Sequence, residues 1–390
     1  MKITFITCWC YLRIYAVQSR HLKENLESIT DNKIKLVTSN CSCYNSGILS
    51  TATAPFSYRY LLSGEVDKFI RLPHIRNRDG TSITHRLARF YRSLSEPMRG
   101  NQYIKSLSDC DIAHFHQASD AFGYSAVAYF LNHVHDKKKV VTIHNLSPQQ
   151  WQNPSLNQIY NHADALIVHN HYFKNVITES GVEANKIHVI PYGAVLKPLK
   201  EYKRQGIIMF AGSPLIDVKG FEYIASALHK LREENIVIPL KLHGFHMRGH
   251  QEWANDIIRK ENIEDQSEWL KIRNEDELID AYQNSMMCVV PYTGYPGSFP
   301  ISMALSNALP VIVGDTLGMP EYVDGAGIVF KSKSVNEIAS ALKKIYGDEV
   351  LRNKMGNQGR LTAEKLFSWP TVAEQTLAVY KRFYINNSLH

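Results

Sequence analysis

The sequence predicts an α/β protein with parallel sheets in two domains, and two observations lead to this prediction. Short apolar runs alternate with helical stretches along the whole chain, which is typical of βαβ units and parallel sheets. The chain also has 390 residues, which is too many for one comfortable core, so two domains of similar size are expected.

The first domain is expected over residues 1–200. Its strands are predicted at apolar runs, and each run is followed by polar residues or a turn. A hinge is placed at Pro191-Tyr192-Gly193 and in the polar stretch that follows. The runs that predict strands are residues 1–7, 111–116, 140–144, 163–168 and 187–193.

The second domain is expected over residues 201–370, beginning with the apolar strand of residues 207–211. Further strands are predicted at residues 286–290 and 311–313, separated by an Ala/Leu-rich helix. The last helix, residues 371–384, is expected to cross back to the first domain.

A loop in the second domain predicts an anion site. The strand of residues 286–290 runs into a Pro/Gly loop that ends at Gly297, Ser298 and Phe299, where the helix begins. Unpaired backbone N–H groups and the helix dipole attract anions at such a helix start. Ligands of open α/β sheets bind at the carboxyl ends of the strands. The sequence therefore predicts that a phosphorylated ligand binds here.

The residues after this loop resemble a known family. Ala308-Leu309-Pro310-Val311-Ile312 is similar to the end of the donor-nucleotide motif in retaining glycosyltransferases of the family-4 type. The resemblance implies their GT-B fold, in which two Rossmann-like domains face a cleft. In that family two glutamates separated by seven residues precede this end. The corresponding residues are Tyr295 and Met303, so the motif is degenerate. The predicted strands follow the family's order, and the resemblance covers nearly the whole chain.

The resemblance implies transfer of a sugar from a nucleotide-diphosphate sugar to a glycan or lipid-linked acceptor, with retention of configuration. It also implies a place in bacterial surface polysaccharide or lipopolysaccharide synthesis. Two alternatives stay open: a non-catalytic glycosyltransferase-like subunit that binds a partner or a sugar, favoured by the missing glutamates, and a nucleotide-sugar epimerase on the same fold.

The family's phosphate-binding residues fall on two positions of this chain. The family places an arginine directly after the glycine that ends the first strand of the nucleotide domain, where this chain has Ser213. Six residues later it has a Lys-Gly pair, which is kept here as Lys219-Gly220. A lysine beside a diphosphate stabilises the charge of the departing nucleotide. The alternative for Lys219 is a solvated lysine at a helix start.

Other candidate site residues follow predicted strands. His144 corresponds to the family's histidine that faces donor and acceptor, and it is the candidate catalytic residue, with a structural histidine as the alternative. Gly244, Arg273 and Glu321 are further nucleotide-sugar candidates. A helix-entry turn explains Arg273 equally well, and a structural role explains Glu321 equally well. Asn274 is better explained as a helix cap.

Four more histidines carry weaker predictions. His114 and His116 share one face of their strand and either line the same site as His144 or are structural. His169 and His171 are interpreted as a loop or helix-cap pair, and no role is assigned to them.

The charge pattern favours anionic partners. The net charge is +7, but the chain lacks zinc-finger, RNP and helix-turn-helix signatures, so no nucleic-acid partner is expected. An amphipathic basic helix is predicted within residues 71–99. Its Arg86, Arg89 and Arg92 either contact an anionic membrane or face solvent on a surface helix whose apolar side packs on the first domain.

Neither a signal peptide nor an apolar run of membrane-spanning length is recognised, so a cytoplasmic location, with peripheral contact at the inner face of the membrane, is expected. Six cysteines include two Cys-x-Cys pairs, which fit buried thiols better than zinc ligands. No metal cofactor is expected, because Lys219 and helix N–H groups can stabilise a diphosphate.

Overall fold

The computed structural model describes residues 1–8, 13–39, 68–70, 104–105, 107, 109–116, 131–144, 160–210, 216–244, 250–294 and 298–385. The chain divides into two compact units. The first unit contains Met1–His169, Phe173–Ile190 and Ala373–His390, and the second contains Asn170–Tyr172 and Pro191–Val372. The chain thus passes from the first unit to the second at Ile190 and returns after Val372.

The first unit is built on a parallel sheet in which seven strands are described, in the order β3-β2-β1-β4-β5-β6-β7. Phe5, Leu36 and Phe115 lie fully buried in it, as expected for a parallel sheet that is covered on both faces. The strands are β1 (Ile3–Cys8), β2 (Lys35–Ser39), β3 (Lys68–Ile70), β4 (Ile112–His116), β5 (Lys138–Thr142), β6 (Ala165–Val168) and β7 (Ile187–Val189). Helices of the unit in the described ranges include α1 (Arg13–Ile29) and α7 (His171–Glu179).

The second unit repeats this plan. Its described strands form a parallel sheet in the order β10-β9-β8-β11-β12-β13. They are β8 (Ile207–Phe210), β9 (Leu240–His243), β10 (Ser267–Trp269), β11 (Met287–Val290), β12 (Val311–Gly314) and β13 (Gly327–Phe330). In both sheets the order reverses beside the first strand, between β1 and β4 and between β8 and β11. Open sheets bind their ligands at the carboxyl ends of strands beside such a reversal.

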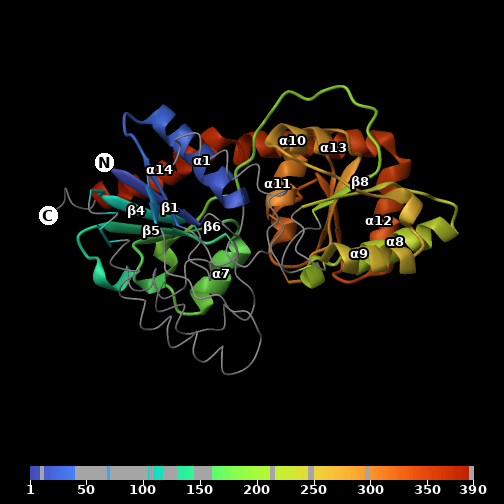
Figure 1. Ribbon diagram of the computed structural model, residues 1–390, viewed down its shortest axis with the longest axis horizontal. Helices are drawn as coiled ribbons and strands as arrows, with labels where there is room; N and C mark the ends of the chain where they lie inside the picture. Colours follow the sequence, from blue (N-terminus) through green and yellow to red (C-terminus); the bar gives the residue numbers. More distant parts are fainter. Residues whose placement is uncertain are drawn as a thin grey trace. The chain divides into compact units, whose positions relative to one another are not determined.

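Helices cover both faces of the second sheet (Figure 1). α8 (Phe221–Glu233) packs against α9 (His250–Lys260) and α12 (Val335–Gly347) on one face. On the other face, α11 (Ser298–Ser306) packs against α10 (Glu275–Gln283) and α13 (Glu349–Leu366). The chain runs outward from β8 toward one edge of the sheet and from β11 toward the other. Because each crossover between parallel strands is right-handed, the two directions place their helices on opposite faces.

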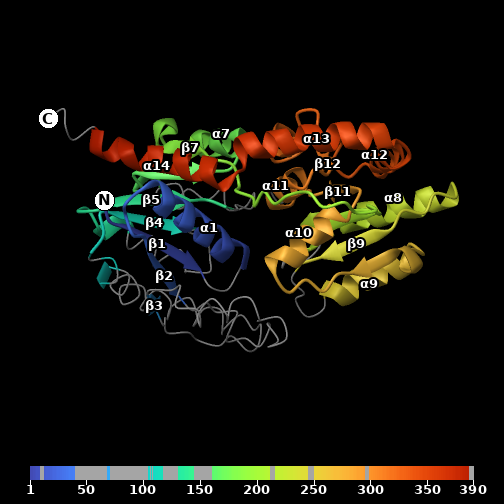
Figure 2. The same ribbon diagram turned by 90° about the horizontal axis from the view of Figure 1, so that it is seen from above.

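The last helix, α14 (Trp369–Ile385), begins in the second unit and continues in the first. Figure 2 shows it beside β4 and β5. Its Tyr380 is fully buried, and the hydroxyl lies 2.6 Å from Nδ1 of His114 on β4. This contact anchors the helix to the centre of the first sheet.

Two parallel sheets covered by helices confirm the predicted α/β fold with two Rossmann-like units. The basic segment of residues 71–99 lies outside the described residues. Cys110 and Cys288 are buried free thiols, and the side chains of the other four cysteines lie outside what the structure describes. None of the described helices is both long and apolar enough to cross a membrane.

Candidate functional site

The carboxyl ends of β8 and β11 form the edge at which the predicted anion site lies. The two strands pair in parallel, with Met287 opposite Ile207. Both strands are apolar and buried along their whole length. Chemistry at this edge therefore comes from the segments that follow the strands.

Lys219 occupies this edge at the end of the short 3-10 turn η4 (Ile216–Lys219). Its side chain is only 1% exposed, and Nζ lies 4.6 Å from the ring centroid of Phe210 and 4.0 Å from that of Tyr292. Two π faces therefore contact the amine. Burial lowers the pKa of Lys219 well below its usual value. An anionic ligand would counter that shift, because opposite charge favours the protonated form.

Tyr292 is held firmly in place beside the lysine. Its hydroxyl donates a hydrogen bond of 2.8 Å to the backbone oxygen of Phe210, and its own carbonyl accepts one of 3.1 Å from Oγ1 of Thr316. The two aromatic residues were missed at the sequence level. The available signal was an aromatic residue at or just beyond the end of each central strand.

Gly220 allows the η4 turn to approach the segment after β11. Its φ is +66°, and a Cβ atom here would lie 2.1 Å from the carbonyl oxygen of Pro291. Next to this contact, the amide of Thr293 donates a hydrogen bond of 2.9 Å to the carbonyl of Val218. The Lys-Gly pair thus combines a cation with the one residue type that fits the turn.

Phe299, in the first turn of α11, belongs to the same edge. Its ring packs edge-on against Phe210, with centroids 6.0 Å apart, and against Tyr192, at 5.8 Å. The structure therefore brings Lys219 and Phe299 to one common neighbour, Phe210. Ser213, Gly297 and the side chain of Ser298 lie outside the described residues.

Met303 stands where the family has its second glutamate. It lies in α11 and is 5% exposed, so this position buries an apolar side chain and offers no carboxylate. Tyr295, at the first glutamate position, lies outside the described residues.

Gly244 follows β9, the neighbour of β8, and therefore lies at the same edge, with a φ of +133°. The residue before it, His243, is buried, and Nε2 lies 3.1 Å from the hydroxyl of Tyr282. Burial, with a smaller contribution from the charge of Lys219, lowers the pKa of His243 to about 3. His243 is therefore a neutral hydrogen-bonding residue at this edge.

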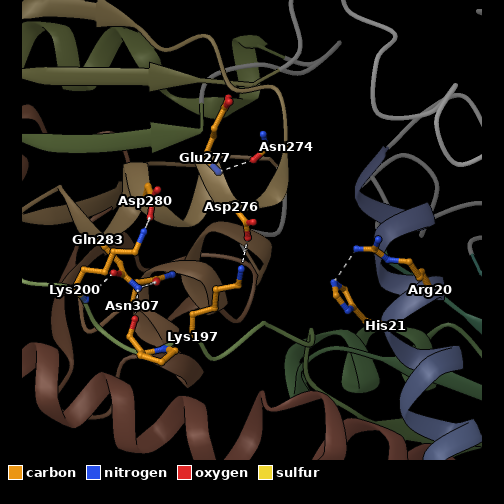
Figure 3. A network of polar contacts seen from close by, with 11 residues as sticks. Arg20, His21, Lys197, Lys200, Asn274, Asp276, Glu277, Asp280, Gln283 and Asn307 are labelled. Atoms are coloured by element: carbon orange, nitrogen blue, oxygen red, sulfur yellow. Dashed lines mark hydrogen bonds and ion pairs between the residues drawn. The ribbon is translucent and has the colours of Figure 1, made fainter.

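Arg273 and Asn274 have structural partners at the start of α10. The Asn274 side chain accepts a hydrogen bond of 2.8 Å from the amide of Glu277 (Figure 3), which confirms the helix-cap interpretation. The exposed Arg273 places Nε 3.2 Å from a carboxylate oxygen of Glu277 and donates its amide to the other oxygen at 2.7 Å. The strand before them, β10, ends at Trp269.

Glu321 also has structural partners. Its carboxylate accepts hydrogen bonds from the backbone amides of His171 and Tyr172, at 2.7 Å and 2.8 Å. These two residues belong to the second unit with Glu321. Both carboxylate oxygens are thereby used at a helix N-terminus, which is a stabilising position for an acidic side chain.

His144 lies in the first unit, two residues beyond β5, and is 6% exposed. Its Nδ1 is 2.9 Å from Nε2 of His169, whose Nδ1 is 2.9 Å from the carbonyl oxygen of Ile190. Burial lowers the pKa of His144 well below its usual value and that of His169 to about 4. His169, to which no role was assigned from the sequence, is therefore the direct partner of the candidate catalytic residue.

His114 and His116 complete a cluster of four buried histidines. The ring centroids of this pair are 4.4 Å apart, and His116 stacks on His144 at 5.8 Å. His114 is fixed by Tyr380 and by Oγ1 of Thr142, at 2.6 Å and 2.7 Å. The strand ends could have indicated this cluster, because the carboxyl ends of neighbouring parallel strands share one edge.

An Asp-x-Asp triplet, a frequent source of metal ligands, occurs at Asp109-Cys110-Asp111. It precedes β4 and so lies at the amino edge of the sheet, away from the histidine cluster on β4 and β5. Asp109 pairs with the Lys2 side chain at 2.6 Å, and Asp111 accepts the Lys2 amide at 2.6 Å. Within the described ranges, no group of three or more His, Cys, Asp or Glu residues is arranged to hold a metal ion.

Two family models match this chain, one in each half. "Glycosyltransferase Family 4" matches residues 60–197, and "Glycosyl transferases group 1" matches residues 195–362.

Curated relatives are distant and match in part. A mannosyltransferase of Mycolicibacterium hassiacum, named "MMP alpha-(1->4)-mannosyltransferase", is 24% identical over 216 residues, covering 53% of this chain and 51% of its own length. The "O-antigen chain mannosyltransferase B" of Escherichia coli is 26% identical over 141 residues, covering 35% of this chain and 36% of its own. The chain thus spans about half or less of the curated relatives that it matches.

The whole fold is shared with solved structures. One is Anabaena Alr3699/HepE in complex with UDP, with a TM-score of 0.70 and 14% sequence identity, covering 98% of this chain and 100% of that one. This likeness concerns the fold. Together with the glycosyltransferase domains matched in both halves of the chain, it supports a glycosyltransferase of the two-domain GT-B fold.

Proposed function

We propose that this chain transfers a sugar from a nucleoside-diphosphate sugar to a glycan or lipid-linked acceptor. The observation that carries the proposal is Lys219, buried between two aromatic rings at the strand reversal of the second unit. The matched glycosyltransferase models and the UDP bound by a protein of the same fold support a nucleotide donor.

The chemistry requires stabilisation of the leaving diphosphate. Negative charge grows on the diphosphate as its bond to the sugar breaks, and a fixed cation lowers the energy of that state. In our proposal Lys219 is this cation, and the backbone amides at the start of α11 donate further hydrogen bonds to the diphosphate. Met303 provides no carboxylate for the donor ribose, so binding rests more on these groups.

Reaction with retention is part of the proposal. A retaining transfer needs no second carboxylate if the leaving diphosphate accepts the proton of the acceptor hydroxyl on the same face of the sugar. The protein then acts by positioning the reactants and stabilising the leaving group. His144 is proposed to contact a hydroxyl group of the sugar.

The proposed setting is synthesis of bacterial surface polysaccharide or lipopolysaccharide. One relative is named as an O-antigen mannosyltransferase and another as a mannosyltransferase, so mannose is the first donor sugar to test. We further propose that no divalent metal takes part. Activity should then survive EDTA, and activity restored only by manganese would contradict this part.

The test is a screen of UDP-, GDP- and CMP-sugars by thermal shift, followed by slow donor hydrolysis and transfer assays. Binding with release of the nucleoside diphosphate supports a transferase. Binding without hydrolysis or transfer to any offered acceptor would favour the non-catalytic subunit. This alternative has the apolar Met303 position in its favour.

A further inference from the structure

The hydrogen bonds of His169 fix which of its ring nitrogens carries the proton. Nδ1 lies 2.9 Å from the carbonyl oxygen of Ile190, and a carbonyl oxygen only accepts hydrogen bonds. Nδ1 must therefore carry a hydrogen. The pKa of His169 is lowered to about 4, so the ring is neutral at pH 7 and Nε2 is unprotonated.

This state of His169 determines the state of His144. Nδ1 of His144 lies 2.9 Å from the unprotonated Nε2 of His169, so a hydrogen bond between them needs a proton on His144 Nδ1. Burial, followed by the neighbouring histidines His169, His116 and His114, lowers the pKa of His144, so this ring is also neutral. In a neutral ring with a proton on Nδ1, Nε2 is unprotonated and acts as a hydrogen-bond acceptor.

We propose that His169 is a positioning residue that holds His144 in the Nδ1–H tautomer, so that Nε2 accepts a hydrogen bond from a hydroxyl group of the sugar substrate. The sugar as ligand rests on the proposed function, whereas the tautomer does not. The two hydrogen bonds from His144 to His169 and from His169 to Ile190 carry the inference, and all three residues belong to the first unit.

His116 is a second, independent sign of a polar ligand beside His144. Its ring stacks on that of His144 with an angle of 21° between the planes. It is 2% exposed, and neither of its ring nitrogens has a hydrogen-bond partner in the part of the chain that the structure describes. Buried polar atoms without partners are costly and mark places where a ligand or water binds. A molecule with several hydroxyl groups would supply partners to both histidines.

The test reads the tautomer directly. The protein is labelled with 15N-histidine, and two-bond 1H–15N correlations are recorded at pH 7 without any sugar. His144→Gln assigns the His144 signals by their loss. Nδ1 should appear in the protonated range and Nε2 in the unprotonated range.

Two substitutions of His169 separate positioning from packing. His169→Phe removes the acceptor, and the Nε2–H tautomer of His144 should then become the major form. His169→Gln offers an amide oxygen near the former Nε2, and it should restore the parent pattern. His188→Gln changes a histidine on β7 that contacts Arg382, and it should leave the His144 signals unchanged. Thermal unfolding shows that each variant is folded.

A protonated Nε2 on His144 in the parent protein would overturn the proposal, whatever the variants do. So would an unchanged tautomer in folded His169→Phe. If transfer activity is found, His169→Phe should lower kcat by about 10–100-fold, with a smaller change in KM. This is the size of effect seen when the partner that orients a metal-ligating histidine is removed. Correct tautomers without any transfer activity would instead reject the proposed function and leave the positioning role standing.

Discussion

At the scale of single residues, polar chemistry concentrates in buried side chains that follow the ends of strands. Lys219 and His243 lie at the edge of the second sheet, and His144, His116 and His169 lie at that of the first. Burial lowers the pKa of each of these groups below its ordinary value. A charge is costly in such places unless a ligand compensates it, and this is why these residues carry our functional proposals.

Lys219→Ala should weaken binding of a nucleoside diphosphate by about 1.5–3 kcal/mol, the size of a charge-assisted hydrogen bond. Isothermal titration calorimetry measures the change. Lys230→Ala is the matched control, because Lys230 is a partly exposed lysine on α8. Among the hydrogen bonds of its side chain that the structure describes, it contacts only Asn336, at 2.6 Å. Equal affinity in parent and Lys219→Ala would remove Lys219 from the site.

The buried histidines should make the protein acid-sensitive. Burial lowers the pKa of His116 to about 3, from an ordinary value near 6.5 in the unfolded chain. The unfolded chain therefore binds more protons between these values, and stability falls as pH falls, by up to about 1.4 kcal/mol per pH unit for each such histidine. The stability is fully present above pH 6.5.

His116→Phe should reduce this dependence, because it keeps an aromatic ring and removes one titrating group. The measurement is the unfolding temperature at pH 7 and at pH 4.5. The fall in unfolding temperature from pH 7 to pH 4.5 should be smaller in His116→Phe than in the parent. The exposed His162, changed to Gln, should behave like the parent. An identical loss in all three proteins would contradict the burial argument.

At the scale of elements, turns and strand ends determine where the candidate site residues lie. Strand positions were predictable, because a buried parallel strand is a short continuous apolar run, as in β11 and β12. The pairing of His144 with His169 was not, because it depends on β5 and β6 being neighbours in the sheet. The Lys219 position was predictable from the Lys-Gly pair. Its two aromatic neighbours were not, because they lie at or just beyond the ends of two different strands.

Two site candidates that were chosen by resemblance alone have structural partners in the fold. Arg273 and Glu321 both have local partners, a helix turn in one case and a helix N-terminus in the other. Such contacts are decided by where a helix begins, which is the least certain feature of a sequence-based prediction.

Gly220→Ala should disturb the η4 turn and with it the placement of Lys219. The new methyl group would meet the carbonyl of Pro291, and the backbone would keep an unfavourable positive φ. Gly181→Ala is the matched control, since its φ is +100° but nothing lies within 4 Å of the added atom. Gly220→Ala should lose more stability than the control and bind nucleotide more weakly. Equal losses would show that the close approach is unimportant.

At the scale of the whole molecule, the net charge of +7 is compatible with anionic ligands and with an anionic membrane surface. The proposed lipid-linked acceptor would bring the chain to such a surface. The basic segment that predicts this contact lies outside the described residues, so its role is tested by binding rather than by geometry.

Replacing Arg86, Arg89 and Arg92 together with Gln should lower binding to liposomes that contain anionic lipid, by about 1 kcal/mol for each arginine near the surface. The residual binding should be less sensitive to salt. Transfer to a short soluble acceptor should be nearly unchanged, which controls for damage to the fold. Equal liposome binding by parent and variant would leave the segment as ordinary surface.

The central claim is that a nucleoside diphosphate binds at the carboxyl edge of the second sheet, where β8 and β11 part. Hydrogen exchange with and without UDP or GDP tests it most directly. We expect protection in peptides covering residues 216–220 and 291–306, and little change in those covering the α10 start at residues 273–277. Protection confined to other segments, with these two unchanged at saturating nucleotide, would contradict the claim.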